Sequence, residues 1–371
     1  MDLAAWEAAG LYDPDAPDAA ERRELLAYLA SVGCTVDEMA ANADGLIRLA
    51  SRRVLFGSEQ PVTVAHLAEV ARCDETLARR VRLAAGLPDP GDAAVCSPIE
   101  ATILESFVLG TAIFGDDVTL QFTRVLGNAV SGIAEAALAL FAANRSVPLF
   151  AEGATPAEVA RAGAEATAAL LAVPPLLDVL LRVHFEAASL DRLSGGDGPG
   201  PTVSVAVAFV DLVGSTQLTH LLTGAELAVA LGDFERVASE AVVAVGGRIV
   251  KRIGDAVMFV ASDAVSACDA ARAVVAAVDA HPTLSAARAA VAFGSVLPRD
   301  GDYFGTPVNL AARAVPFAEP GTVVVSAAVR DALVAAEPPI TALPLGEQAL
   351  KGFDDPVALF TLPATAQEPV P

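Results

Sequence analysis

A glycine- and proline-rich segment, SGGDGPGPT at 194–202, separates two halves of this chain that differ in hydrophobic periodicity. Before it, apolar residues recur at helical spacing, as in ERRELLAYLASVG and GNAVSGIAEAALALFAANR. After it, short alternating apolar–polar stretches are interspersed with helical ones. Because the segment itself has linker composition, we expect a helical domain over 1–190, a linker over 191–201 and a mixed α/β domain over 202–371.

The second half contains the turn signals of antiparallel strands. Strands are predicted in PTVSVAVAFVDL, GRIVKRI, AVMFV, AARAAVAFGSVL and TVVVS, with helices over 216–244, 263–280, 306–318 and 326–336 and a closing hairpin near the end. Gly254-Asp255, between two of these strands, is a hairpin signal. Since hairpins require antiparallel pairing, the fold class is expected to be α+β.

Composition indicates a folded protein, since 54% of the residues are hydrophobic and 19% are charged. The formal net charge of -22 argues against nonspecific nucleic-acid binding. The most apolar stretches, 129–143 and 168–183, are interrupted before they reach the roughly 20 apolar residues that span a bilayer. The first residues, MDLAAWEAAGLYD, lack the pattern of a secretory signal. We therefore expect a cytoplasmic protein without a transmembrane segment.

The segment FVDLVGST combines a strand end with a glycine turn. Alternation places Asp211 on the same strand face as Phe209. Gly214, Ser215 and Thr216 would then open a helix, whose free N–H groups suit a phosphate, while the nearby carboxylate suits Mg²⁺. Taken by itself, the segment is better explained as a plain strand-to-helix turn with a Ser or Thr cap.

The hairpin around KRIGD contains one of only two lysines in the chain, against 22 arginines. Strict alternation puts Arg248 and Arg252 on one strand face and Lys251 on the other, less polar face, where an ammonium needs a partner. Asp255 at the turn would meet Asp211 if the strands are neighbours, and a divalent cation would relieve their repulsion. A surface Lys251–Asp255 pair of little energetic value is an equally good explanation.

The segment GDYFGTPVNLAARA places Asn309 and Arg313 four residues apart, on one face of a predicted helix. Asp302 stands seven residues before Asn309, in a loop flanked by glycines. An amide and a guanidinium so placed can hold a ribose oxygen and a pentavalent phosphorus. For this segment alone, an amphipathic helix with two solvent-facing polar residues is the better explanation.

Together, FVDLVGST, KRIGD and DYFGTPVNLAAR resemble in order and spacing the class III nucleotidyl cyclase catalytic domain, over about residues 202–362. The resemblance implies a ferredoxin-like fold with its active site at a head-to-tail homodimer interface. It also implies an adenylate cyclase, which converts ATP to 3′,5′-cyclic AMP and pyrophosphate. Two ions of Mg²⁺ or Mn²⁺ per active site would be bound by Asp211 and Asp255.

The same resemblance assigns the other residues of the site. Lys251 and Asp302 would read adenine at ring N1 and at the N6 amine. Asn309 would orient the ribose, and Arg313 would stabilise the transition state. Guanylate-specific members carry Glu and Cys-type residues at the two base-reading positions, so the pair favours ATP over GTP.

In the helical half, LYDPDAPDAAERRELLAYL and TVAHLAEVARCDETLARRVRLAAGLP resemble the N-terminal domain of soluble, pH-sensing actinobacterial adenylyl cyclases. This implies an autoinhibitory regulatory domain that also dimerises. His184 continues an apolar stripe along the last helix. A partly buried histidine there would couple protonation to active-site assembly, although a satisfied core histidine is the commoner explanation. The Ala- and Leu-rich helices are also compatible with a lipid signal.

Two other functions stay open on the sequence alone. An inactive cyclase fold could bind ATP as a sensor, although the complete set of six residues argues against it. The helical half also contains helix-turn-helix spacing, with Arg79, Arg80 and Arg82 on the second helix, which would suit DNA binding. The acidic balance of the chain disfavours that function. No GGDEF-type signature of diguanylate cyclases is present.

Overall fold

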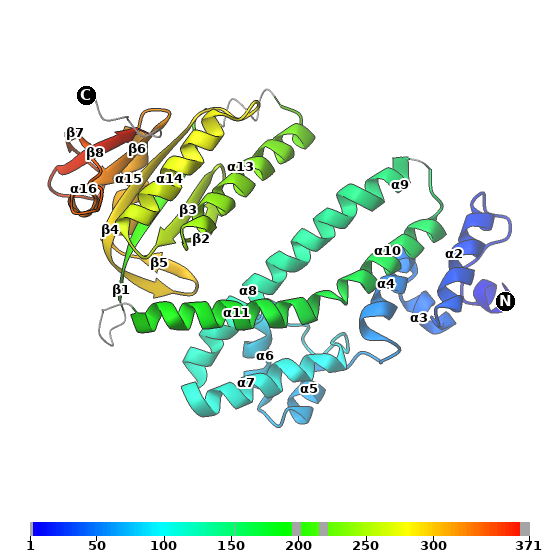
Figure 1. The fold of residues 1–371 in the computed structure, drawn as a ribbon. Helices are drawn as coiled ribbons and strands as arrows, with labels where there is room; N and C mark the ends of the chain where they lie inside the picture. Colours follow the sequence, from blue (N-terminus) through cyan, green and yellow to red (C-terminus); the bar gives the residue numbers. More distant parts are fainter. Residues whose placement is uncertain (1–2, 152, 195–201, 215–221, 364–371) are drawn as a thin grey trace. The chain divides into compact units, whose positions relative to one another are not determined.

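The computed structural model describes residues 3–151, 153–194, 202–214 and 222–363 (Figure 1). The chain forms two compact units, Met1–Ser189 and Leu190–Pro371. The predicted α+β class is confirmed, because a helical N-terminal region precedes a mixed sheet. Helix α11 runs to Ser194, into the segment expected as a linker, and residues 195–201 lie outside the described part of the chain.

The first unit is built from short helices followed by long ones. In order, they are α1 (Leu3–Ala8), α2 (Ala19–Ser31), α3 (Val36–Ala41), η1 (Ala43–Gly45), α4 (Leu46–Phe56), α5 (Val64–Val70), α6 (Glu75–Ala84), η2 (Pro98–Glu100), α7 (Ala101–Phe114), α8 (Asp116–Phe141), η3 (Ala142–Ser146), α9 (Val147–Ala151), α10 (Pro156–Leu170) and α11 (Val173–Ser194). Thr35 and Thr155 cap α3 and α10 with capping boxes. One core gathers around Leu26 and a second around Leu67.

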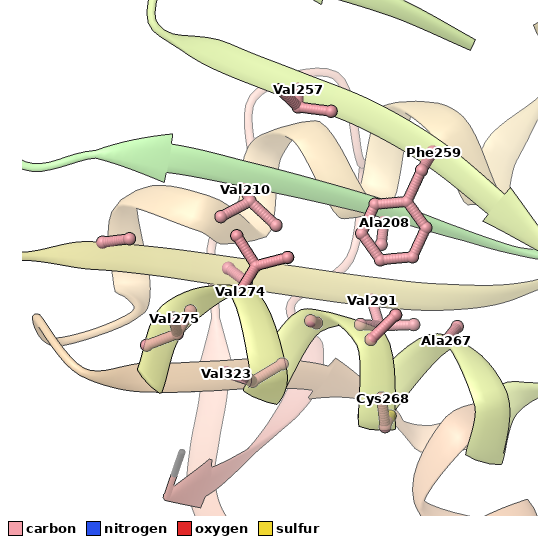
Figure 2. Packing of buried hydrophobic residues seen from close by; sticks show 14 of the residues in the cluster. Ala208, Val210, Val257, Phe259, Ala267, Cys268, Val274, Val275, Val291 and Val323 are labelled. Carbon is pink, nitrogen blue, oxygen red and sulfur yellow. The ribbon is translucent and has the colours of Figure 1, made fainter. Parts of the chain in front are cut away.

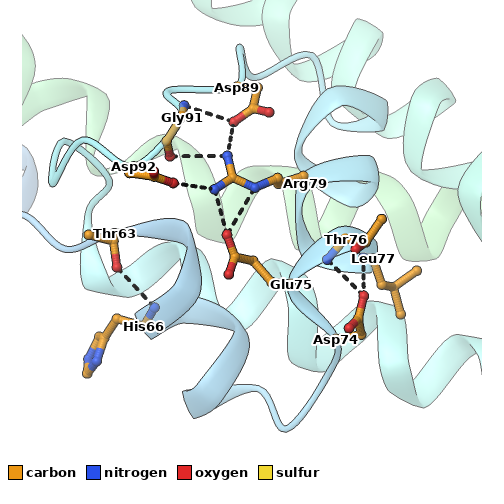
Figure 3. Close-up of polar contacts among 10 residues, drawn as sticks. All are labelled: Thr63, His66, Asp74, Glu75, Thr76, Leu77, Arg79, Asp89, Gly91 and Asp92. Atoms are coloured by element: carbon orange, nitrogen blue, oxygen red, sulfur yellow. Dashed lines mark hydrogen bonds and ion pairs between the residues drawn. The ribbon is translucent and has the colours of Figure 1, made fainter.

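Helices α5 and α6 form the predicted two-helix element, but Arg79 is engaged within the chain (Figure 3). Its guanidinium donates to Glu75 Oε1 (2.6 Å), to Asp89 Oδ1 (2.5 Å) and to Asp92 Oδ1 (3.1 Å). It also donates to the carbonyl oxygen of Gly91 (3.1 Å). Arg79 therefore ties the loop after α6 to the helix.

Arg82 is likewise engaged inside the unit. It is buried, pairs with Glu100 and donates to the carbonyl oxygen of Pro88 (3.2 Å). Of the three arginines on α6, Arg80 is the exposed one. Two of the three cations that a DNA contact would need thus tie α6 to the loop that follows it and to η2, which supports a packing role for the element.

The long helices at the end of this unit are apolar and exposed. The stretches Asp116–Leu149 and Pro156–Ser189 are long and apolar enough to cross a membrane, with mean hydropathies of 1.6 and 1.7, and their apolar windows are 0% buried. Both stretches contain the predicted interruptions, Glu135 in the first and Pro174-Pro175 and Asp178 in the second, so the prediction that neither spans a membrane stays a prediction. Length and composition alone are weak grounds for a membrane span, because core helices of soluble proteins also meet them. A large exposed apolar surface indicates contact with another molecule.

The second unit is a sheet covered by helices on both faces (Figure 1). Its elements are β1 (Val203–Leu212), α13 (Gly224–Ala244), β2 (Arg248–Ile253), β3 (Ala256–Ala261), α14 (Ala264–Asp279), β4 (Ala287–Arg299), β5 (Asp302–Phe304), α15 (Thr306–Ala314), η4 (Val315–Phe317), β6 (Thr322–Ser326), α16 (Ala327–Val334), β7 (Leu343–Gln348) and β8 (Val357–Pro363). The strand order is β2-β3-β1-β4-β6-β8-β7, and β5 pairs with β4 off this path.

The first four strands have the predicted ferredoxin-like arrangement. Strand β1 pairs antiparallel with β3 on one side and with β4 on the other, and β2 pairs with β3. Helices α13 and α14 connect β1 to β2 and β3 to β4. Strand β6 then joins β4 in parallel after the crossover through α15.

Alternation along β1 divides the unit into two cores. Ala208 and Val210 face the α14-side core, under α13, α14 and α16 (Figure 2). Val207 and Phe209 face the α15-side core, which includes Ala311 and Ala314 of α15. The strand thus carries Asp211 to its end on the α15 side, the face on which the sequence pattern placed it with Phe209.

The packing of Cys268 yields a first test. This thiol lies on α14 in the α14-side core, and burial raises its pKa to about 12 (Figure 2). At pH 8 only about one molecule in ten thousand would carry the reactive thiolate. We expect iodoacetamide to leave Cys268 unmodified in the native protein while it labels the partly exposed Cys73, as measured by peptide mass spectrometry.

Labelling in 6 M guanidinium, roughly enough to unfold an ordinary domain, provides the control, in which both thiols should react. Native labelling of Cys268 at the rate seen in guanidinium would contradict the packing of α14 on the sheet.

Candidate active site

Two carboxylates meet where β1 ends beside the β2–β3 hairpin. Asp211 lies near the end of β1, and Asp255 occupies the turn between β2 and β3. The backbone N–H of Leu212 donates to the carbonyl oxygen of Asp255 (3.3 Å). Gly254 has φ +62, which a two-residue turn with glycine first requires. The turn chemistry read from the sequence therefore brings Asp255 to Asp211.

The charge of Asp211 is only partly compensated. Burial is the largest influence on its carboxyl and raises the pKa, and the neighbouring Asp255 raises it further. Arg288 acts in the opposite direction, since its Nη2 and Nε donate to Asp211 Oδ2 at 3.2 and 3.4 Å. The net result is a pKa above the ordinary value, as expected for two carboxylates that share a half-buried site.

The donor set suits a divalent metal ion. Asp211 and Asp255 supply hard carboxylate oxygens. In the part of the chain that the structure describes, no group of three or more His, Cys, Asp or Glu side chains is placed to hold a metal by itself. Mg²⁺ is commonly held by one or two carboxylates, with substrate phosphates and water completing its coordination. The pair therefore fits a metal that binds together with a phosphorylated substrate.

Strand β2 departs from the predicted alternation. Its register against β3 shifts between Ile249 and Lys251, so Val250 is the extra residue of a β-bulge. As a result, Arg248 and Lys251 both lie opposite β3 residues of the α15-side core. The prediction that these two side chains lie on opposite faces is wrong, because strict alternation does not hold across a bulge.

Lys251 has the partner that its half-buried position requires. Its Nζ donates to Asp302 Oδ2, and the backbone N–H of Tyr303 donates to Asp302 Oδ1 (2.8 Å). This partner is 51 residues away in the sequence. Lys251 therefore pairs with Asp302 and does not form the local surface pair with Asp255 that the sequence left open. The pair places an ammonium donor beside a carboxylate acceptor, which matches the two edge groups of adenine.

Asp302 is held differently from the sequence prediction. It begins strand β5 rather than lying in a loop, and in the antiparallel β4–β5 ladder it lies opposite Arg299 of β4. The connecting residues Asp300 and Gly301 have φ +56 and +81, as in the tight hairpin turn that Asp-Gly favours. This dipeptide is the sequence signal that would have predicted the hairpin.

Helix α15 presents Asn309 and Arg313 to solvent on one face, while Ala311 is buried beneath the helix. Gly305 precedes the helix with φ +147, and a Cβ there would lie 3.2 Å from the carbonyl oxygen of Ser295. Only glycine therefore fits this close passage of the chain over β4. Among the described residues, neither polar side chain has a hydrogen-bond or ion-pair partner.

Of the three residues that the sequence predicted to follow β1 as a phosphate-binding turn, the structure describes Gly214. Gly214 is exposed with φ +75, and the preceding residue, Val213, donates its N–H to the carbonyl oxygen of Ala286 (2.8 Å). Ser215 and Thr216 lie outside the described residues. Their predicted role at a helix start therefore stays a prediction.

His184 is exposed on α11, whereas the sequence pattern predicted partial burial. The apolar residues around it, such as Leu180 and Leu181, are exposed as well. The stripe exists, but it does not face a core of its own chain. Within its own unit, His184 therefore lacks the partial burial on which the predicted proton switch depends.

Arg288 is the site residue that sequence reasoning missed. It lies on β4 directly opposite Asp211 of β1. The available signal was weak, since it is a single cation in AARAAVAFGSVL, the strand expected to pair with β1.

Comparison with known proteins agrees with this architecture. Residues 7–188 match the model of the adenylate cyclase regulatory domain family. An uncharacterized protein of Mycobacterium tuberculosis is 37% identical over 98% of this chain and 94% of its own length. An adenylate cyclase of Streptomyces coelicolor is 30% identical over 97% of this chain and 91% of its own. A pH-sensitive adenylate cyclase of M. tuberculosis is 34% identical over 85% and 80%.

The chain belongs to the adenylate cyclase family, and its helical unit carries the regulatory domain of such enzymes. Among solved structures, the adenylyl cyclase CyaB from P. aeruginosa is 24% identical over 43% of this chain and 93% of that chain, with a TM-score of 0.39.

The electrostatics of Asp211 generate a second test. Because its pKa is raised in the folded protein, the carboxyl favours folding when protonated, and that contribution is lost as pH rises through the folded pKa. We expect Asp211→Asn to raise the Tm of the metal-free protein at neutral pH by on the order of 2 °C. The gain should shrink as the pH falls through the folded pKa.

Differential scanning calorimetry in EDTA measures this effect, and Asp355→Asn, on an exposed turn, serves as the matched control. A lower Tm in Asp211→Asn would mean that the Arg288 pair outweighs the cost of burying the carboxylate.

Proposed function

We propose that this protein converts ATP to 3′,5′-cyclic AMP and pyrophosphate at a homodimer interface. The observation that carries the proposal is that two pairs of charged residues lie on the α15 side of one sheet. Asp211 meets Asp255 at the end of β1, and Lys251 of β2 meets Asp302 of β5. The first suits metal-bound phosphates, and the second suits an adenine edge.

Each side chain has a role that its chemistry supports. Asp211 and Asp255 would hold two Mg²⁺ or Mn²⁺ ions, which when bound supply charge to activate the ribose 3′-oxygen and to neutralise pyrophosphate. Lys251 would donate to adenine N1, and Asp302 would accept from the N6 amine. The turn of Gly214, Ser215 and Thr216 would contact phosphate, as proposed for a helix start.

Asn309 and Arg313 support the dimer. Both are exposed on α15 without partners among the described residues. An exposed amide and guanidinium, four residues apart, can complete a site on a second chain, where Asn309 would orient the ribose and Arg313 would stabilise charge at the α-phosphate. In a dimer with twofold symmetry this contribution is reciprocal, so two equivalent sites form.

The N-terminal unit would regulate the catalytic one. Its match to the regulatory domain family supports this role, and a relative named for pH sensitivity makes protons a reasonable signal to test. We propose a cytoplasmic enzyme in which the exposed apolar faces of α8 and α11 contact protein rather than lipid. Charged residues within both stretches, including Glu135 and Asp178, are costly at the centre of a bilayer.

Cyclic AMP formation by the purified protein with ATP and Mn²⁺ tests the reaction and the dimer together. We expect Asp211→Ala and Arg313→Ala each to lose at least about 100-fold in activity, because the first removes a proposed metal ligand and the second removes the cation proposed to act at the α-phosphate. If the two residues act from different chains, co-expression of the two variants should restore about a quarter of wild-type activity through heterodimers.

Each inactive variant expressed alone is the control. No cyclic AMP from the wild type at either pH 6 or pH 8 would contradict the cyclase assignment, whereas activity without recovery in the mixed protein would contradict only the shared site.

Base selection tests the role of the Lys251–Asp302 pair. In Lys251→Glu/Asp302→Cys we expect kcat/KM for ATP to fall by about 100-fold relative to that for GTP, because the groups that pair with the adenine edge are gone. Lys351→Glu, which changes the other lysine, should leave the ratio unchanged. A double variant with the wild-type ratio would show that another group reads the base.

A further inference from the structure

Arg288 stands at the edge of the carboxylate pair with a contact that no catalytic role above requires. In the antiparallel β1–β4 ladder it lies directly opposite Asp211, so its position is fixed by backbone pairing. Both side chains are half-buried, with 28% and 23% of their surfaces exposed. The only other Arg on β4, Arg299, sits at the far end of the strand and pairs with Asp300.

The two hydrogen bonds of Arg288 converge on one oxygen. Its Nη2 and Nε reach Asp211 Oδ2 at 3.2 and 3.4 Å. A bidentate Arg–carboxylate pair uses both oxygens and gains strength from the matched geometry. Here both hydrogen bonds of Arg288 go to the same oxygen and both are rather long. The pair is therefore weaker than a bidentate pair, and the other carboxylate oxygen, Oδ1, accepts no bond from Arg288.

A purely structural explanation for this pair is weak. Half-exposed ion pairs contribute little to stability, and apolar residues of similar volume often stabilise a buried position better than an ion pair does. The local electrostatics give a better reason. Asp255 lies beside Asp211 at the end of β1, and Arg288 is the cation whose hydrogen bonds to Asp211 offset the repulsion between the two carboxylates.

We propose that Arg288 is a resident counter-ion of the metal site, which competes with divalent cations for Asp211 Oδ2. In the metal-free enzyme it neutralises part of the carboxylate pair and keeps the pair assembled. It also weakens metal binding in the absence of nucleotide, because its positive charge remains close to any cation on Asp211. Substrate phosphates add negative charge and shift this balance towards the metal.

The inference rests on the proposed metal role of Asp211 and Asp255, and Mn²⁺ binding tests it without measuring turnover. The probe is Mn²⁺ alone, titrated into full-length protein without nucleotide, with free Mn²⁺ followed by electron paramagnetic resonance. We expect Arg288→Gln to bind Mn²⁺ about tenfold more tightly than the wild type, because a unit positive charge a few ångströms from the metal is removed.

Three further variants separate the effect of charge at this position from the effects of shape and of overall net charge. Arg288→Lys keeps the charge and loses the guanidinium fork, so we expect it to bind Mn²⁺ as the wild type does. Arg288→Met retains aliphatic volume, so it makes the same neutral comparison if the glutamine variant fails to fold. Arg299→Gln changes the net charge equally on the same strand, away from the site, and should leave the affinity unchanged.

The outcomes distinguish this inference from the proposed function. Asp211→Ala should abolish the Mn²⁺ binding seen in the wild type, which ties that binding to the carboxylate pair. Equal or weaker affinity in the neutral Arg288 variants, with Asp211-dependent binding intact, would overturn the counter-ion role alone. Wild-type binding that does not depend on Asp211 would overturn both this inference and the proposed metal site.

Discussion

The antiparallel pairing of β1 with β3 on one side and β4 on the other is the constraint on which the site depends. It sets Asp211 opposite Arg288 and brings its strand end to the turn that carries Asp255. Because β2 pairs with β3 and β5 with β4, the same ladder also positions Lys251 and Asp302. Five residues from four separate segments of the sequence are thus located by backbone hydrogen bonds, before any ligand contributes energy.

The parts of this arrangement that depend on local signals could be predicted from the sequence. Strand alternation predicted that Asp211 lies on the same sheet face as Phe209, and the Gly254-Asp255 dipeptide predicted the hairpin between β2 and β3. The faces of β2 could not be predicted, because the extra residue Val250 leaves no mark in a run of alternating apolar and basic residues. The pairing of Arg288 with Asp211 depends on strand register, which a single sequence does not reveal.

The N-terminal unit shows a different limit of sequence patterns. Periodicity identified its long helices, but it did not show whether their apolar stripes meet a core or face outwards. In α8 and α11 most of the large apolar residues are exposed in the described chain. A stripe on a helix predicts burial against something, and only the structure shows that this partner is not the rest of the unit.

In an acidic chain with an anionic substrate, the position of each cation near the site matters, because the overall charge repels the substrate. With a formal net charge of -22, the long-range field does not attract a nucleoside triphosphate. Local groups must supply the attraction at contact distance. Lys251 and Arg288 are already paired with Asp302 and Asp211 in the ligand-free chain, and in the roles proposed above they face the adenine edge and the metal site. Each pair keeps its charges half-buried, and in the proposed function it would exchange the internal partner for a ligand group, adenine at Lys251 and Asp302 and a divalent cation at Asp211. Pre-pairing of this kind would favour ligands that supply new partners for the released groups.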